Sequence, residues 1–250
     1  MKATKKAPKG TPRVSVVVPV KNEEGNIRTL VDEIVQAATD IGPFEVIYVD
    51  DGSTDTTPSI LTELSESYPW FHWVKHKESC GQSAAVRTGV RHATAPVVVT
   101  MDGDGQNNPA YIPEMLSVLE AGGDAMALVA GQRTGRKDGK FKSFQSKIAN
   151  RVRGAILRDG TRDTGCGLKM FKRDVYLALP YFDALHRFMP ALVKREGFGI
   201  GYVDVVDRTR YTGVSNYGLF DRLWVSIMDL AGVWWLIRRR RRVPQVQKMD

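Results

Sequence analysis

The 250-residue sequence predicts a doubly wound α/β fold, in which helices cover both faces of a mostly parallel sheet. Strand-like and helix-like segments alternate strictly over about the first hundred residues. The strand-like segments are continuous apolar runs rich in β-branched residues, as in strands buried on both faces of a parallel sheet. With 42% hydrophobic residues, the composition is that of a folded protein.

Each predicted strand is a short run of Val, Ile and aromatic residues, the types that favour strands. Most of these runs are followed by a polar or glycine-containing turn. The predicted strands are residues 14–20, 44–49, 70–74, 96–101, 125–133 and 200–210.

The predicted helices carry apolar residues at helical spacing. The first extends from Ile27 to Ala38, with Asn22 or Asn26 as its cap and Gly42 as its stop. Pro58 suits the first turn of the next helix. Further helices are expected at residues 81–93 and 186–198, a basic mobile loop running into a helix at 133–147, and a turn and helix at 163–179.

Basic residues gather at the two ends of the chain, which carries a formal net charge of +8. Without the basic residues of segments 1–13 and 238–248, the body is close to neutral. A nucleic-acid-binding protein more often carries its positive charge on a folded face, so no nucleic-acid partner is expected. Basic ends on a neutral body fit contact with anionic lipid headgroups.

Only two cysteines occur, Cys80 and Cys166, and they are far apart. Neither belongs to a CxxC pair, so neither a disulfide framework nor a zinc site is expected. The basic N-terminus is followed by a short apolar run interrupted by Pro19, unlike a secretory signal peptide. We therefore expect a cytoplasmic protein.

Polar clusters follow three of the predicted strands. NEEGN (22–26) follows the first strand, DDGSTD (50–55) the second and DGDGQN (102–107) the fourth. In doubly wound sheets, ligands bind at the carboxyl ends of the strands, so the three clusters are expected to meet at one edge.

The third cluster places two carboxylates one residue apart, and these repel each other unless a cation lies between them. Asp102 and Asp104 can reach one divalent cation together, and Gln106 can add a neutral oxygen. Mg²⁺ or Mn²⁺ prefers such oxygen ligands and leaves positions for substrate phosphates and water. No GxxxxGKS phosphate loop is present.

Four motifs in residues 14–115 resemble the inverting nucleotide-sugar glycosyltransferases of family 2, in that family's order and spacing. They are VVVPVKNEEGNI, VDDGSTD, GQSAAVRTG and MDGDGQNNP. The continuation to residue 218 resembles the branch of dolichol-phosphate mannosyltransferases and undecaprenyl-phosphate sugar transferases, through GQRTGR, DTGCGLKMFKRDV, HRFMPAL and DRTRYTGVSNYG.

This resemblance implies a GT-A fold and transfer of a sugar from a UDP- or GDP-sugar to a polyprenyl phosphate, with inversion and with Mg²⁺ or Mn²⁺. It implies nucleotide contacts by Pro19, Glu23, Asp51, Gln82 and Asp102, and metal ligation by Asp102, Asp104 and Gln106. Asp102 is similar to a residue that contacts either the ribose or the metal. The acceptor phosphate would lie near Arg133, Lys142, Ser146, His186 and Arg187, although Lys142 stands where arginine is expected. The catalytic set would be Asp104 and Arg133, with Arg208 and Arg210 facing the diphosphate or the acceptor. An acceptor phosphate is already largely a dianion at neutral pH, so no protein base is required.

The chain is expected to divide into a disordered basic arm (1–13), a glycosyltransferase domain (14–215) and a C-terminal segment (216–250). Within the domain, a nucleotide half covers about 14–110 and an acceptor half about 111–215. The C-terminal segment is expected to form an amphipathic interfacial helix with a basic tail. Paired tryptophans precede an arginine run there, and the apolar core is shorter than the roughly twenty residues that a membrane span needs. Residues 219–242 would then contact an anionic membrane surface on its cytoplasmic side. Packing of this helix on the domain's own core is the alternative.

Two other functions remain open from the sequence. The nucleotide-sugar half could serve a saccharide acceptor, although the QxxRW signature of processive synthases is absent. The chain could also be a non-catalytic, nucleotide-sugar-binding subunit of a membrane complex, but its metal aspartates are intact. If the acceptor is a polyprenyl phosphate, a small membrane protein could assist recruitment of the chain to the membrane.

Overall fold

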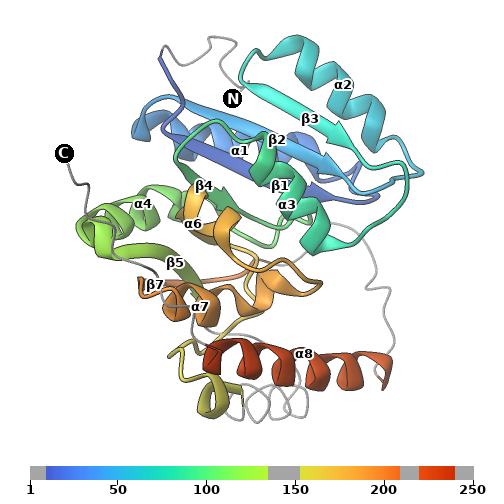
Figure 1. Cartoon of the computed structure of the whole chain (residues 1–250). Helices are drawn as coiled ribbons and strands as arrows, with labels where there is room; N and C mark the ends of the chain where they lie inside the picture. Colours follow the sequence, from blue (N-terminus) through green and yellow to red (C-terminus); the bar gives the residue numbers. More distant parts are fainter. Residues whose placement is uncertain (1–9, 135–152, 209–219, 240–250) are drawn as a thin grey trace, which may run out of the picture.

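The computed structural model describes residues 10–134, 153–208 and 220–239, without the side chains of 220–226. A seven-stranded sheet with helices on both faces forms its centre, as the sequence predicts (Figure 1). Several predicted features lie outside the described residues: most of the basic arm, the loop that contains Lys142 and Ser146, Arg210, and the tail beyond Arg239.

The sheet is parallel except for one strand. Its order is β3-β2-β1-β4-β6-β5-β7, and β6 is antiparallel to both of its neighbours, β4 and β5. Neighbours β1 and β2 pair from Val14 with Phe44 to Val20 with Asp50. The strands are β1 (Val14–Val20), β2 (Phe44–Asp50), β3 (Phe71–Lys75), β4 (Val97–Thr100), β5 (Met126–Arg133), β6 (Lys169–Lys172) and β7 (Gly199–Val205).

Strand β6 corrects the prediction of a turn and helix over residues 163–179. Only Arg173–Ala178 forms the helix α6, and the four residues before it form the strand. Met170 and Phe171 are buried in the two apolar cores on opposite faces of the sheet. A four-residue run of Lys, Met, Phe and Lys has no decisive periodicity, so the sequence could not separate it from the helix that follows.

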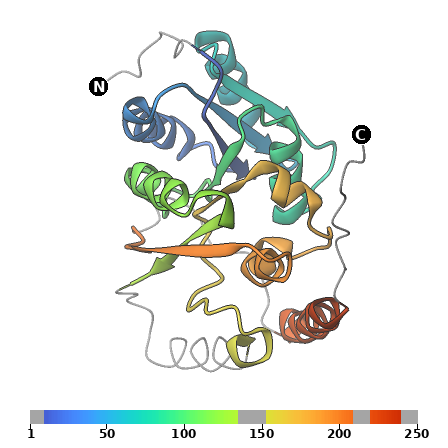
Figure 2. The same ribbon diagram turned by 60° about the vertical axis from the view of Figure 1, so that its left-hand side comes forward.

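The helices divide between two apolar cores, one on each face of the sheet (Figure 2). Side chains of α1, α2 and α4 pack on one face, and those of α3, α6, α7 and α8 on the other. Each fully buried Leu, Ile, Val or Phe side chain contributes about 1.5–3 kcal/mol to this packing. The α-helices besides α6 are α1 (Ile27–Ala38), α2 (Thr57–Ser67), α3 (Gln82–His92), α4 (Ile112–Ala121), α7 (Leu185–Arg195) and α8 (Phe220–Arg238), and short 3₁₀ turns occupy Thr39–Ile41, Pro109–Tyr111 and Gly123–Ala125.

Helix α8 lies beside α7 at the edge of the domain (Figure 1). Val233 is buried, and Leu230 and Leu236 pack on the same core. Trp234 and Trp235 remain 41% and 52% exposed. Its described apolar side chains therefore point both into the domain and out to solvent, so the predicted division into one apolar and one polar face is not confirmed.

None of the helices in the described part of the chain combines the length and the hydropathy that crossing a membrane requires.

Candidate functional site

The polar loops after β1 and β2 lie together at the carboxyl edge of the sheet. The backbone N–H of Asn22 donates to Ser53 Oγ at 2.9 Å, and the backbone N–H of Thr54 donates to Asn22 Oδ1 at 2.8 Å. The Glu23 N–H donates to Thr57 Oγ1 at 3.0 Å. These bonds bring two of the predicted clusters together, because parallel strands end at a common edge.

Asp51 organises the neighbouring loop between β3 and α3. Its carboxylate accepts hydrogen bonds from the backbone N–H groups of Cys80 and Gly81, at 2.8 and 2.9 Å, and from the Ser79 hydroxyl at 2.8 Å. His76 Nδ1 lies 2.8 Å from the same carboxylate. Burial acts to raise the pKa of Asp51, but these hydrogen bonds outweigh it and lower that pKa below its ordinary value. Asp51 is therefore held as an anion at the predicted nucleotide edge.

Asp51, His76 and Cys80 also form a close group of potential metal ligands, with ligand atoms within 4.8 Å of one another. The sequence did not indicate this group, because Asp51 follows β2 whereas His76 and Cys80 lie in the loop between β3 and α3. The hydrogen bonds that Asp51 accepts from this loop already account for the close approach of the three residues, without a metal ion.

The predicted metal ligands lie at the end of β4. Gln82 Nε2 donates to Asp102 Oδ1 at 2.7 Å, and the backbone N–H of Gln106 donates to Asp104 Oδ1 at 3.0 Å. Asp104 is only 8% exposed. Burial, followed by the neighbouring Asp104 carboxylate, raises the pKa of Asp102 to about 6.

This donor set fits a divalent cation. The Asp104 carboxylate adds to burial in raising the pKa of Asp102, and a bound cation would offset this repulsion between the two carboxylates. Asp102, Asp104 and the Gln106 amide supply oxygen atoms of the kind that Mg²⁺ and Mn²⁺ prefer.

Lys169 is a charged residue of the site that sequence reasoning missed. It is 2% exposed, and its ammonium donates to the carbonyl oxygens of Thr164, at 3.4 Å, and Cys166. Burial lowers the pKa of Lys169, while Cys166 and Asp102 act to raise it. Lys169 lines a small cavity together with Pro19, Gln82, Asp102 and His186. The structure thus brings four of the predicted site residues around one buried lysine.

His186 lies in this cavity in its neutral form. Its Nδ1 is 2.7 Å from Ser83 Oγ. Burial, with smaller contributions from Lys169 and Arg187, lowers the pKa of His186 to about 3. A neutral imidazole can hydrogen-bond a phosphate oxygen, but it supplies no positive charge there. Arg187, one residue further on, is exposed.

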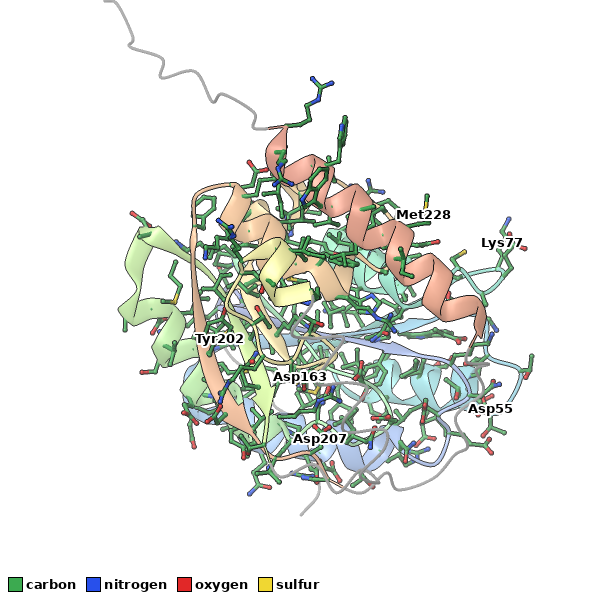
Figure 3. The ribbon with its side chains drawn as sticks, turned by 90° about the horizontal axis from the view of Figure 1, so that it is seen from below. Asp55, Lys77, Asp163, Tyr202, Asp207 and Met228 are labelled. Carbon is green, nitrogen blue, oxygen red and sulfur yellow. The ribbon has the colours of Figure 1, made fainter. Side chains whose placement is uncertain are left out.

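Arg133 is held by two carboxylates. Its guanidinium forms a bidentate pair with Asp163, with Nη2 2.9 Å from Oδ1, and its Nη1 lies 3.3 Å from Asp207 Oδ2. Asp163 and Asp207, labelled in Figure 3, belong to the segment before β6 and the segment after β7. Burial acts to lower the pKa of Arg133, but its carboxylate partners outweigh it and raise that pKa further.

Arg208 is likewise paired. Nη1 donates to Glu33 Oε1 at 2.5 Å, Nη2 donates to Asn108 Oδ1, and the backbone N–H donates to the Gln106 carbonyl at 3.0 Å. The last two contacts place Arg208 against the loop that carries Asp104 and Gln106. Glu23 lies at the same edge, where it accepts a hydrogen bond from Asn26 Nδ2 at 2.5 Å.

Comparison with solved structures supports the fold. The chain is similar to glucosyl-3-phosphoglycerate synthase from Mycobacterium tuberculosis, solved with Mn²⁺, uridine diphosphate and phosphoglyceric acid. The TM-score is 0.67 at 21% identity, over 93% of this chain and 80% of that one. The same enzyme has also been solved with Mg²⁺ and uridine diphosphate, with a TM-score of 0.65.

Two relatives are similar in sequence. A dodecaprenyl-phosphate galacturonate synthase from Rhizobium johnstonii is 35% identical over 234 residues, 92% of this chain and 68% of the relative. An undecaprenyl-phosphate 4-deoxy-4-formamido-L-arabinose transferase from Pectobacterium carotovorum is 33% identical over 207 residues, 82% of this chain and 62% of the relative. The chain thus spans between three fifths and seven tenths of the length of these relatives.

The family model for glycosyl transferase family 2 matches residues 15–179. That match covers β1 from its second residue, all of β2 to β6, and the three polar clusters that follow β1, β2 and β4. The chain therefore belongs to glycosyl transferase family 2.

Proposed function

We propose that the chain is an inverting glycosyltransferase that moves a sugar from a nucleotide-sugar to a polyprenyl phosphate. The observation that carries the proposal is the convergence of Asp102, Asp104 and Gln106 at the end of β4, beside Gln82 and the buried Lys169. Family membership and two relatives named for polyprenyl-phosphate sugar transfer support the same reaction. Their names specify galacturonate and 4-deoxy-4-formamido-L-arabinose, so a mannosyl donor receives no preference.

The donor would bind across the loops that follow β1, β2 and β4. Pro19, Glu23, Asp51 and Gln82 are the proposed nucleotide contacts. The Asp51 carboxylate also holds the β3–α3 loop in place through the backbone N–H groups of Cys80 and Gly81. Asp102, Asp104 and Gln106 would hold Mg²⁺ or Mn²⁺. When bound, the ion supplies charge stabilisation to the departing nucleoside diphosphate.

The acceptor phosphate requires no protein base, because its second pKa is near 6 and it is largely a dianion at neutral pH. The protein has only to position this phosphate for attack. Arg133 is the described candidate, since its bidentate contact with Asp163 fixes the guanidinium plane. His186 can donate a hydrogen bond while neutral. Lys142, Ser146 and Arg210 remain proposals from the sequence. Attack opposite the departing diphosphate inverts the anomeric carbon.

The acceptor is a membrane lipid, so the enzyme is proposed to work at the cytoplasmic membrane surface. Exposed Trp234 and Trp235 beside Arg238 and Arg239 support contact through residues 219–242. A small membrane protein is a further proposed partner in recruitment.

The reaction is tested with the purified full chain, Mn²⁺ or Mg²⁺, a short polyprenyl phosphate in detergent and a panel of UDP- and GDP-sugars. Mass spectrometry of the lipid should show one added sugar from one donor, and chelation of the metal should abolish it. The Asp104→Asn variant should lose transfer by about a hundredfold or more, as expected when charge stabilisation is removed. Asp124→Asn, at an exposed carboxylate distant from the site, is the matched control.

Full turnover by Asp104→Asn would contradict the metal assignment. A product sugar found only on an added saccharide would contradict the lipid acceptor.

A further inference from the structure

A cavity of about 590 Å³ lies outside the proposed catalytic site, between the segment 153–158, α7 and α8. Figure 2 shows α7 and α8 nearly end-on, with the short helical segment 153–157 beside them. The volume of the cavity falls in the range of ligand pockets, about 300–1,000 Å³. We call this cavity the α7–α8 groove.

The lining of the α7–α8 groove is largely apolar. Leu157 and Ala191 are buried beneath it, and Trp234 and Ile156 remain 41% and 39% exposed. Ile237 completes this lining from α8. An apolar hollow with an exposed tryptophan at its edge is a site for a hydrocarbon chain at the boundary with water.

The rim of the groove is basic. Four basic residues line the groove, Arg158, Lys194, Arg195 and Arg238, and the exposed Arg158, Lys194 and Arg238 form its rim. No acidic side chain lines the groove among the described residues. Two of the four are engaged with the protein: Lys194 Nζ donates to the Arg158 carbonyl at 2.7 Å, and Arg195 donates to the Leu236 carbonyl at 2.9 Å and pairs with Glu196. Arg238 stacks over the Trp234 ring at 3.9 Å, with its charge at the mouth of the groove.

The groove is separate from the catalytic cavity, although α7 lines both. His186 lines the catalytic cavity and Ala191 lines the groove. These two positions differ by about 140° around the helix, at 3.6 residues per turn. The groove and the catalytic cavity therefore lie on different sides of α7.

We propose that the α7–α8 groove binds one acyl chain of an anionic phospholipid, with the lipid phosphate between Arg158 and Arg238. This inference rests on the proposed action at a membrane surface and adds a defined lipid site to it. An apolar floor with a cationic rim matches an acyl chain joined to a phosphate, and a free phosphate would leave the floor exposed to water. Binding there would hold α8, and with it Trp234 and Trp235, at the headgroup level.

The test measures binding of dispersed short-chain phosphatidylglycerol to the full-length chain by native mass spectrometry. Phosphatidylcholine of the same chain length and inorganic phosphate are the comparison ligands. Ala155→Trp, at an exposed lining position, should fill the groove and weaken phosphatidylglycerol binding by about tenfold or more. If that variant does not fold, Ile156→Gln makes the lining polar with a smaller change.

The rim is tested by the double variant Arg158→Gln, Arg238→Gln. It should lose the preference for phosphatidylglycerol over phosphatidylcholine, because the two cations at the mouth recognise the phosphate's net charge. Lys77→Gln with Arg91→Gln removes the same charge from exposed positions elsewhere and should change nothing.

Phosphatidylglycerol chains brominated near the headgroup should quench Trp234 fluorescence in the wild type, with Trp234→Phe as the reference. Equal binding by the wild type, Ala155→Trp and the rim variant would overturn the proposal. So would absence of lipid binding to the wild type, as when another segment of the chain fills the groove.

Transfer to a detergent-solubilised polyprenyl phosphate separates this inference from the proposed function. The groove and rim variants should keep transfer in detergent. Absence of transfer in the wild type, with lipid still bound in the groove, would refute the reaction and leave the lipid site standing.

Discussion

Asp102 owes its position to a residue without a side chain. A Cβ added at Gly167 would overlap the carboxylate of Asp102, so the Gly167 backbone packs directly against it. The Gln82 amide then fixes the same carboxylate from the other side, at 2.7 Å. Gly167 thus positions a proposed metal ligand although it carries no functional group.

The variant Gly167→Ala should therefore displace the Asp102 carboxylate. A shift of about 1 Å in a catalytic group can cost about a hundredfold in rate, so we expect a loss of kcat of that order with a smaller change in Tm. Steady-state kinetics and thermal unfolding measure the two effects. Gly154→Ala is the control, because a Cβ at Gly154 meets nothing within 4 Å. A Gly167→Ala enzyme with wild-type kcat would show that Asp102 does not need this position.

His186 should make the protein less stable in acid. The pKa of His186 is about 3 in the folded protein, below its ordinary 6.5, so the unfolded state binds the proton more readily. Its contribution to stability is complete above pH 6.5 and is lost as the pH falls from 6.5 towards 3. Ser83, Lys169 and Arg187 face the ring, and both cations oppose its protonation.

Between pH 7.5 and 5.5 this linkage lowers the free energy of unfolding by about 1.4 kcal/mol. His186→Gln keeps a hydrogen-bonding group near Ser83 and should flatten the dependence by that amount in chemical denaturation at the two pH values. Identical slopes in the wild type and the variant would contradict a neutral, buried His186.

The sequence predicts the carboxylates of the candidate site and its arginines, but it does not indicate Lys169 or the partners of Arg133. Asp102 and Asp104 are separated by one residue in the chain, so their proposed shared role can be predicted without knowledge of the fold. Lys169 is buried only because β6 is inserted between β4 and β5, which no local pattern shows. The pairing of Arg133 with Asp163 and Asp207 joins positions 30 and 74 residues apart, beyond any spacing rule.

At the scale of elements, α3 approaches the sheet closely because Gly89 faces it. A Cβ at Gly89 would overlap Val17 Cγ1 and lie 3.2 Å from Val49 Cγ2. Gln82 and Ser83, at the other end of α3, reach Asp102 and His186. The distance between helix and sheet therefore affects the site.

Gly89→Ala should destabilise the protein by about 1–3 kcal/mol through overpacking, although alanine favours helix. Val17→Ala removes the methyl that the new Cβ meets, so the double variant should be more stable than the sum of the two single changes predicts. Urea unfolding of the four proteins measures this coupling. Strict additivity would show that Val17 does not limit the approach of α3.

The elements that the sequence predicted well are those with a long repeated pattern. The first two strands and α1 agree with their predictions to within a residue, because their apolar positions recur clearly and turn residues bound them. Strand β6 was missed because it is short and antiparallel in an otherwise parallel sheet. Its place between β4 and β5 depends on the rest of the sheet.

At the scale of the whole molecule, the carboxyl edge of the sheet and the outer surface of α8 are two distinct proposed functional regions. Helix α7 connects them, since it lines the catalytic cavity near its start and supports α8 near its end. Met228 and Trp235 are 57% and 52% exposed on α8, and Met228 points away from the domain in Figure 3. Because Val233 is buried against the core, deleting α8 would expose that core, so surface substitutions give a sharper test.

The double variant Met228→Glu, Trp235→Glu should bind vesicles of anionic lipid at least about tenfold more weakly than the wild type. Each change replaces an apolar side chain, worth about 1.5–3 kcal/mol when fully buried, by a charge that the anionic surface repels. Flotation at low and high salt measures binding, and transfer in detergent checks the fold. Val206→Glu is the control, because Val206 is 56% exposed but follows β7, at a distance in sequence from α8. If the α8 variant floated as well as the wild type and the control, the membrane contact would have to lie on another surface, and α8 would serve only to cover α7.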